Sequence, residues 1–153
     1  MGFRILRVAD QERRSTNPLG VVNTNLTSQL GFDDLALRLW RVSPGQAIPR
    51  HRHQFQNEIY VLLEGTGRLR VDDTLLSVEP LASVLVEPES VRQVFNDTSG
   101  DALWLIGGVP PEAFPLTGDQ HVAERDRLYP DGVEALPPEL DPKVCGQQSS
   151  SQA

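Results

Sequence analysis

Short apolar segments recur along the middle of this chain at intervals of about ten residues. Each of them is followed by a turn that contains glycine, proline or aspartate. Segments this short, with turns between them, are typical of strands. They span residues 35–42, 59–63, 68–71, 75–78, 84–86, 91–95 and 102–106. This series of short strands predicts an all-β fold, either a barrel or a sandwich.

Two of these segments are apolar on consecutive residues rather than on alternate ones. Residues 59–63 and 103–106 show no polar face. A strand with one face in water would alternate, so both faces of these two strands are predicted to be covered. The N-terminal segment and a second subunit are the two candidates for this cover.

The length of 153 residues fits one domain with a hydrophobic core. We expect residues 1–34 to form N-terminal strands that pack on the barrel, including an edge strand at 21–30. Residues 35–109 are expected to form the barrel core.

The composition changes from Pro110 onward, where prolines become frequent. Residues 110–136 are predicted to form a C-terminal extension with a short helix within 117–128, capped by Thr117 or Asp119. Residues 137–153 end in glutamines and serines and are predicted to be a disordered tail.

Composition also limits the partners. The net charge is −7, which disfavours nucleic acids and anionic membranes, and no apolar stretch is long enough to span a bilayer. We therefore expect a cytoplasmic protein. The single cysteine, Cys145, cannot form an internal disulfide and is interpreted as a free thiol without a role.

One stretch between two predicted strands carries chemistry. It reads Gly45, five residues, His51, one residue, His53, four residues, Glu58, six residues, Gly65. Residues two apart on an extended chain face the same side, and four residues can turn the chain back toward them. Two imidazoles and one carboxylate would then converge into a site for a divalent metal.

The alternative interpretation is a polar surface loop, since His51 and His53 lie beside Arg50 and Arg52. A bare pair of histidines would favour that interpretation. The complete spacing, with both glycines and a strand on each side, favours the metal site.

This stretch resembles the first sequence motif of the cupin family at every defining position. The resemblance covers roughly residues 35–109. It implies a single cupin jelly-roll β-barrel with an N-terminal strand extension and an irregular, short-helical C-terminal tail. It further implies one divalent metal ion per chain (Mn, Fe, Ni or Zn), a small-molecule ligand and pairing into homodimers.

The second cupin motif usually reads Gly-x5-Pro-x-Gly-x2-His-x3-Asn, and here it is poorly kept. The aligned positions are Ala82, Pro88, Ser90, Gln93 and Asp97, with Asn96 one residue early. Gln93 therefore stands where the fourth ligand is expected. It either binds the metal through its amide oxygen or only hydrogen-bonds a bound water or Glu58.

Strand alternation extends the site to a pocket. Tyr60 and Leu62 share a face with Glu58, and Val91 and Phe95 share a face with Gln93. Tyr60 is a candidate proton donor, with a space-filling aromatic as the alternative. Arg41 and one of Arg38 or Trp40 are candidates for the pocket mouth, although such an arginine often faces solvent. His121 is interpreted as an exposed helix residue, with a cap over the barrel as the alternative.

Two functions remain open at this point. The first is a metal-dependent enzyme of the dioxygenase, isomerase, decarboxylase or hydrolase type, acting on an anionic carboxylate or enolate. The second is a non-catalytic binding or sensing barrel in which the metal only anchors a ligand. The incomplete second motif favours the second function slightly.

Overall fold

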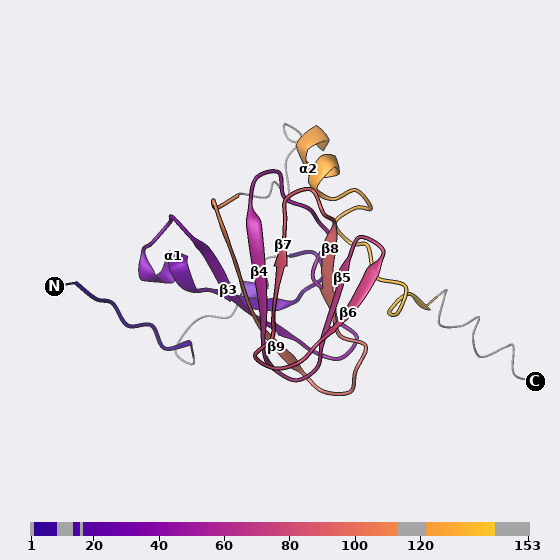
Figure 1. Ribbon diagram of the computed structural model, residues 1–153, viewed down its shortest axis with the longest axis horizontal. Coiled ribbons are helices and arrows are strands. Elements are labelled where there is room, and N and C mark those ends of the chain that lie inside the picture. Colours follow the sequence, from indigo (N-terminus) through magenta and orange to yellow (C-terminus); the bar gives the residue numbers. More distant parts are fainter. Residues whose placement is uncertain (1, 9–13, 16, 113–121, 143–153) are drawn as a thin grey trace, which may run out of the picture.

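The computed structural model describes residues 2–8, 14–15, 17–112 and 122–142. Within these ranges, strands dominate and all strand pairs are antiparallel (Figure 1). The strands are β1 (Arg14–Ser15), β2 (Val22–Asn25), β3 (Ala36–Val42), β4 (Asn57–Glu64), β5 (Gly67–Val71), β6 (Thr74–Val78), β7 (Ser83–Val86), β8 (Arg92–Phe95) and β9 (Ala102–Val109). The helices are α1 (Leu26–Leu30) and α2 (Val122–Leu128). The predicted all-β jelly-roll fold is confirmed.

The strands form two sheets with the core between them. The larger sheet has six strands in the order β1-β2-β3-β9-β4-β7, and the smaller has three in the order β6-β5-β8. Trp104 on β9 is fully buried and packs edge-to-face against Tyr60 on β4, with ring centroids 6.4 Å apart. The other core residues include Val42, Ile48, Leu62, Leu69, Val78, Val86, Val94 and Ile106.

The register of the three central strands determines which side chains share the inner face. Across β3, β9 and β4, Arg38 lies opposite Ile106, which lies opposite Tyr60. The neighbouring row begins at Ala36 and ends at Glu58. Residues in such rows point to the same side of a sheet, so Arg38, Glu58 and Tyr60 face the interior together.

Both glycines of the first motif adopt left-handed backbone conformations. Gly45 has φ 79° after β3, and Gly65 has φ 86° at the turn from β4 to β5. A Cβ atom on Gly65 would lie 2.2 Å from the carbonyl oxygen of Asp101, so no larger residue fits there. The motif spacing is thus set by the two turns that bracket the site.

The N-terminal segment departs from the predicted edge strand over residues 21–30. β2 pairs with β3 only as far as Asn25, and α1 follows at once. The Asn25 side chain accepts a hydrogen bond from the Ser28 N–H, which caps the helix and ends the strand.

The C-terminal extension packs on the barrel from α2 onward. α2 lies within the predicted helical range, whereas Thr117, Asp119 and His121 lie outside the described residues, as does Cys145. Residues 137–142, expected in a disordered tail, instead contain a turn in which the Leu140 N–H donates to the Pro137 carbonyl at 2.9 Å. Glu139 in this turn pairs with Arg70 on β5.

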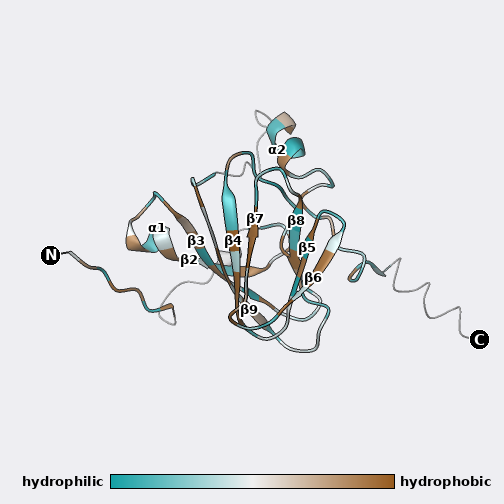
Figure 2. Ribbon diagram, viewed as in Figure 1, coloured by the Kyte–Doolittle hydropathy of each residue, from teal (hydrophilic) through white to brown (hydrophobic). Residues whose placement is uncertain are grey.

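Part of the outer surface is apolar. Figure 2 shows β7 as hydrophobic along its length. Ile59 on β4 and Leu85 on β7 are cross-strand partners and are 48% and 59% exposed. The expected cover over Ile59 is therefore not supplied by the described chain, and the homodimer stays a prediction. No helix in the described ranges combines the length and the apolarity that a bilayer crossing requires.

Candidate metal centre

Two histidines enter the site on the segment between β3 and β4. The His51 N–H donates to the Arg92 carbonyl at 3.0 Å, and the Arg92 N–H donates to the His51 carbonyl at 2.7 Å. Two residues later, the His53 carbonyl accepts a hydrogen bond from the Glu89 N–H at 2.9 Å. These backbone bonds hold both imidazoles in place against β8 and the turn before it.

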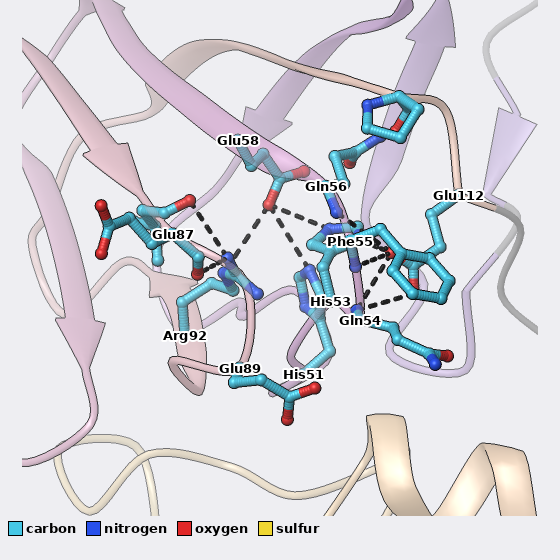
Figure 3. Close-up of polar contacts among 12 residues, drawn as sticks. His51, His53, Gln54, Phe55, Gln56, Glu58, Glu87, Glu89, Arg92 and Glu112 are labelled. Atoms are coloured by element: carbon cyan, nitrogen blue, oxygen red, sulfur yellow. Dashed lines mark hydrogen bonds and ion pairs between the residues drawn. The ribbon is translucent and has the colours of Figure 1, made fainter.

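Glu58, the second residue of β4, meets both imidazoles (Figure 3). Its Oε2 lies 3.7 Å from His51 Nε2 and 3.3 Å from His53 Nε2. One ligand atom from each of the three residues lies within 4.8 Å of the others. The structure thus brings together three of the four predicted ligands.

The environment keeps the Glu58 carboxylate charged. Burial raises the pKa of Glu58, but the hydrogen bonds and charges of His51 and His53 more than offset this effect, so the pKa lies below its ordinary value. Two imidazoles and one ionised carboxylate form a donor set that fits Mn, Fe, Ni or Zn as a divalent ion. These three residues could therefore hold a metal.

Tyr60 is fully buried and its hydroxyl donates a hydrogen bond to Glu58 Oε2. Burial, followed by the charge of Glu58, raises the pKa of Tyr60 well above its ordinary value, so the phenol stays protonated. Tyr60 thus lines the site and also fills the core against Trp104. Both roles considered for it in the sequence are compatible with this position.

Arg92 is the charged group that the sequence did not indicate. Its side chain is fully buried, and its Nε lies 3.8 Å from Glu58 Oε2. Its Nη2 donates to the Glu87 carbonyl at 3.0 Å, whereas Nε and Nη1 have no hydrogen-bond partner among the described residues. Figure 3 shows Arg92 and the two histidines meeting at one carboxylate oxygen.

Gln93 is not brought to this group, because alternate residues of β8 face opposite sides. Arg92 and Val94 point inward, while the Gln93 amide donates to the carbonyls of Ile48 at 3.1 Å and Ala135 at 2.8 Å. Gln93 lines a different hollow, beneath the C-terminal segment.

The backbone conformation indicates that the second cupin motif aligns one residue earlier than the sequence alignment placed it. Leu81 and Glu89 have φ values of 68° and 69°, the left-handed conformation that favours glycine. If these are the two glycine positions, the histidine position falls on Arg92 and the asparagine position on Asn96. The early Asn96 was the available sequence signal for this alignment.

Glu112 is a second residue that sequence reasoning missed. Its carboxylate accepts hydrogen bonds from the N–H groups of Gln54, Phe55 and Gln56 at 2.9, 3.0 and 3.3 Å. It also lies 3.6 Å from His53 Nδ1. Burial raises the pKa of Glu112. The backbone hydrogen bonds and the charge of His53 lower it by more, so the pKa of Glu112 lies below its ordinary value. Glu112 thus orients the imidazole from the side opposite Glu58, a common arrangement around metal-binding histidines.

The His51, His53 and Glu58 group forms part of the wall of a cavity of about 420 Å³. This size is typical of small-molecule sites. The other wall residues come from both ends of the chain and from the large sheet: Asn17, Ala36, Arg38, Trp40, Ile48, Pro49, Gln56, Tyr60, Ile106, Gly107, Glu112 and Tyr129.

Four residues predicted for the pocket lie elsewhere. Arg41 points away from the cavity and pairs with Asp101 at 3.6 Å, while its neighbours Arg38 and Trp40 line the cavity. Leu62 belongs to the core, and Phe95 is buried under the Arg68 guanidinium at 5.9 Å. The Val91 N–H donates to the Asp72 carboxylate at 2.9 Å, outside the cavity.

Residues 38–107 match the sequence profile of the family described as Cupin domain. This part of the chain is a cupin domain. The match runs from β3 to β9 and includes both the histidine pair and Glu58. A search of curated proteins found no significant match.

Solved structures share this fold. A sugar phosphate isomerase of the cupin superfamily from Silicibacter pomeroyi is 25% identical to this chain. The comparison covers 69% of this chain and 74% of that chain, with a TM-score of 0.62. KdgF from Halomonas sp. is 12% identical, with coverage of 71% and 96% and a TM-score of 0.61. A predicted oxalate decarboxylase from Thermotoga maritima is 17% identical, with coverage of 71% and 100% and a TM-score of 0.61. The last two likenesses establish the fold alone.

Proposed function

We propose that this cupin domain holds one divalent metal ion through His51, His53 and Glu58 and acts on an anionic small molecule in the adjoining cavity. The observation that carries the proposal is the convergence of these three ligand atoms within 4.8 Å at the wall of a cavity of about 420 Å³. When bound, the ion would supply a Lewis acid that polarises an oxygen atom of the ligand.

The chain's own residues support this assignment in different ways. Glu112 holds the His53 ring in its orientation, and the Tyr60 hydroxyl holds the Glu58 carboxylate. The ion would add two positive charges beside Arg92 and one carboxylate, which favours an anionic ligand such as a carboxylate or an enolate. The isomerase of Silicibacter pomeroyi is named for a sugar phosphate, which is also an anion.

Arg92 favours a second candidate, a binding or sensing barrel. It occupies the position of the fourth ligand and already balances the charge of Glu58, at 3.8 Å. A metal held by three protein ligands beside a fixed cation would bind weakly and could serve only as an anchor. Turnover of a bound anion by the metal-loaded protein distinguishes the enzyme from the binding module.

The first experiment is elemental analysis of the purified protein after exposure to Mn²⁺, Fe²⁺, Ni²⁺ or Zn²⁺. We expect near-stoichiometric uptake of one of these ions by the wild type and loss of uptake in His53→Ala, because a buried ligand is removed. The matched control is His53→Gln, which keeps a polar donor and should retain part of the uptake if the site remains folded.

Circular dichroism of each variant separates metal loss from unfolding. A wild type that takes up none of the four ions would contradict the proposal. Equal uptake by the wild type and a folded His53→Ala variant would show that the ion binds elsewhere.

A further inference from the structure

Arg38 is a cation in the cavity wall with no carboxylate partner in the part of the chain that the structure describes. It lies on β3, where side chains alternate between the cavity and the opposite face of the sheet. Its NH1 donates to Asn23 Oδ1 at 2.9 Å. No carboxylate oxygen of the described residues lies within 4.0 Å of its guanidinium.

Arg41 on the same strand differs from Arg38 because it has a carboxylate partner. It faces away from the cavity and pairs with Asp101. Arg38 is partly buried, and desolvation by burial lowers its pKa. A guanidinium withdrawn from water without an anionic partner is costly, and an anionic ligand would offset that cost.

The register places Arg38 at a defined separation from the proposed metal ligands. Arg38 on β3, Ile106 on β9 and Tyr60 on β4 stand in one row across three adjacent strands. Adjacent strands are about 4.8 Å apart, so the backbones of Arg38 and Tyr60 are about 10 Å apart. Glu58 is two residues from Tyr60 on the same face, and all of these residues line the same cavity.

The cavity wall also includes apolar side chains. Ile48 and Ile106 line it, and Trp40 and Tyr129 add aromatic rings. Asn23, which is buried, holds the Arg38 side chain through NH1, so the guanidinium is positioned before any ligand arrives. A short carbon chain with a charged group at each end fits this distribution of charge and apolar surface.

We propose that Arg38 binds a second anionic group of the ligand, a carboxylate or a phosphate, while the ligand's chelating end lies at the His51, His53 and Glu58 group. This inference rests on the proposed function and narrows its substrate class to two-ended anions. Arginine offers parallel N–H donors to either kind of anion, so the shared chemistry is a terminal oxyanion.

Calorimetric titration of the metal-loaded protein with matched probes tests this inference. The first pair is 2-oxoglutarate and 2-oxovalerate, which share the chelating end and differ only in the distal carboxylate. The second pair is 3-phosphoglycerate and glycerate, which differ in the distal phosphate. We expect the two-ended anion of one pair to bind about 10- to 100-fold more tightly than its partner, as for a charge-assisted hydrogen bond in a buried site.

Three variants test whether Arg38 causes this binding preference. Arg38→Met should abolish the preference for the two-ended anion and leave binding of the weaker probe of the pair unchanged, and Arg38→Lys should keep part of the preference. Arg41→Met removes an arginine from the other face of the same strand and should bind like the wild type. Metal content is measured for every variant, so that loss of the ion is not mistaken for loss of the distal contact.

Two results would overturn the inference while leaving the proposed function standing. One is that the metal-loaded wild type binds both members of each pair equally or binds none of the four probes. The other is that the preference for the two-ended anion survives in Arg38→Met. A wild type that takes up no metal contradicts the proposed function and this inference together.

Discussion

At the scale of single residues, the site is defined by a buried ion pair as much as by its proposed ligands. Arg92 is fully buried and lies 3.8 Å from Glu58 Oε2. Such a pair contributes little net stability when intact, but removing one partner leaves the other charge buried and uncompensated. Arg92 would therefore compete with a divalent ion for the same carboxylate.

Replacing Arg92 by methionine should lower the free energy of unfolding of the metal-free protein by about 3 kcal/mol, because the buried Glu58 charge loses one of its partners. A bound divalent ion would restore that charge balance. We therefore expect Mn²⁺ or Zn²⁺ to stabilise Arg92→Met more than it stabilises the wild type. Urea denaturation with and without the ion measures both effects.

Arg68→Met is the matched control on β5. Arg68 donates to Asp97 at 2.9 Å in a pair that is accessible to water, so its loss should cost no more than about 1 kcal/mol and should not depend on the ion. Equal metal-induced stabilisation of the wild type and Arg92→Met would contradict the competition between Arg92 and the ion.

At the scale of elements, the turn between β6 and β7 contains a local conflict between residue type and backbone. Leu81 has φ 68° and is 81% exposed. Its N–H donates to the Leu62 carbonyl at 2.7 Å, so the tertiary structure holds the left-handed conformation. A side chain in this conformation costs about 1–2 kcal/mol, and nothing that packs on Leu81 offsets it.

Leu81→Gly should therefore raise the free energy of unfolding by about 0.5–1 kcal/mol, after allowance for the greater freedom of glycine in the unfolded chain. Leu81→Ala is the control, because it removes the exposed side chain but keeps the strained backbone. It should change the stability by less than about 0.5 kcal/mol. Thermal unfolding of the wild type and the two variants measures these differences in stability. A destabilised Leu81→Gly variant would count against a glycine position at residue 81.

At the scale of the whole molecule, the C-terminal segment completes the cavity. Tyr129 lines the cavity, and the Arg50 guanidinium donates to Asp131 at 2.7 Å. The Gln93 amide reaches the Ala135 carbonyl, and Arg70 pairs with Glu139. These contacts tie residues 129–142 to the three-stranded sheet and to the segment between β3 and β4.

A chain that ends at residue 128 should be less stable than the full chain by about 3 kcal/mol or more, because it loses a buried aromatic residue and the partners of buried polar groups. A chain that ends at residue 142 keeps every contact named above and should match the full chain within about 0.5 kcal/mol. Urea denaturation compares the three lengths. If the two shortened chains were equally stable, residues 129–142 would not be part of the folded unit.

The sequence by itself determined the fold class and the three converging residues. Strand spacing and turn residues are local properties, and they predicted an all-β barrel or sandwich. The positions of His51, His53 and Glu58 follow from the two-residue alternation of an extended chain and one short turn. The Gly45 and Gly65 turns then hold this segment in register.

Only the tertiary structure decided which neighbouring charges meet these three residues. A shift of one residue in a strand exchanges its two faces, so the choice between Arg92 and Gln93, and between Arg38 and Arg41, required the observed register. Glu112 reaches His53 across the turn after β9, and Tyr129 arrives from the C-terminal extension. Such contacts depend on chain closure over many residues, and no local pattern in the sequence encodes them.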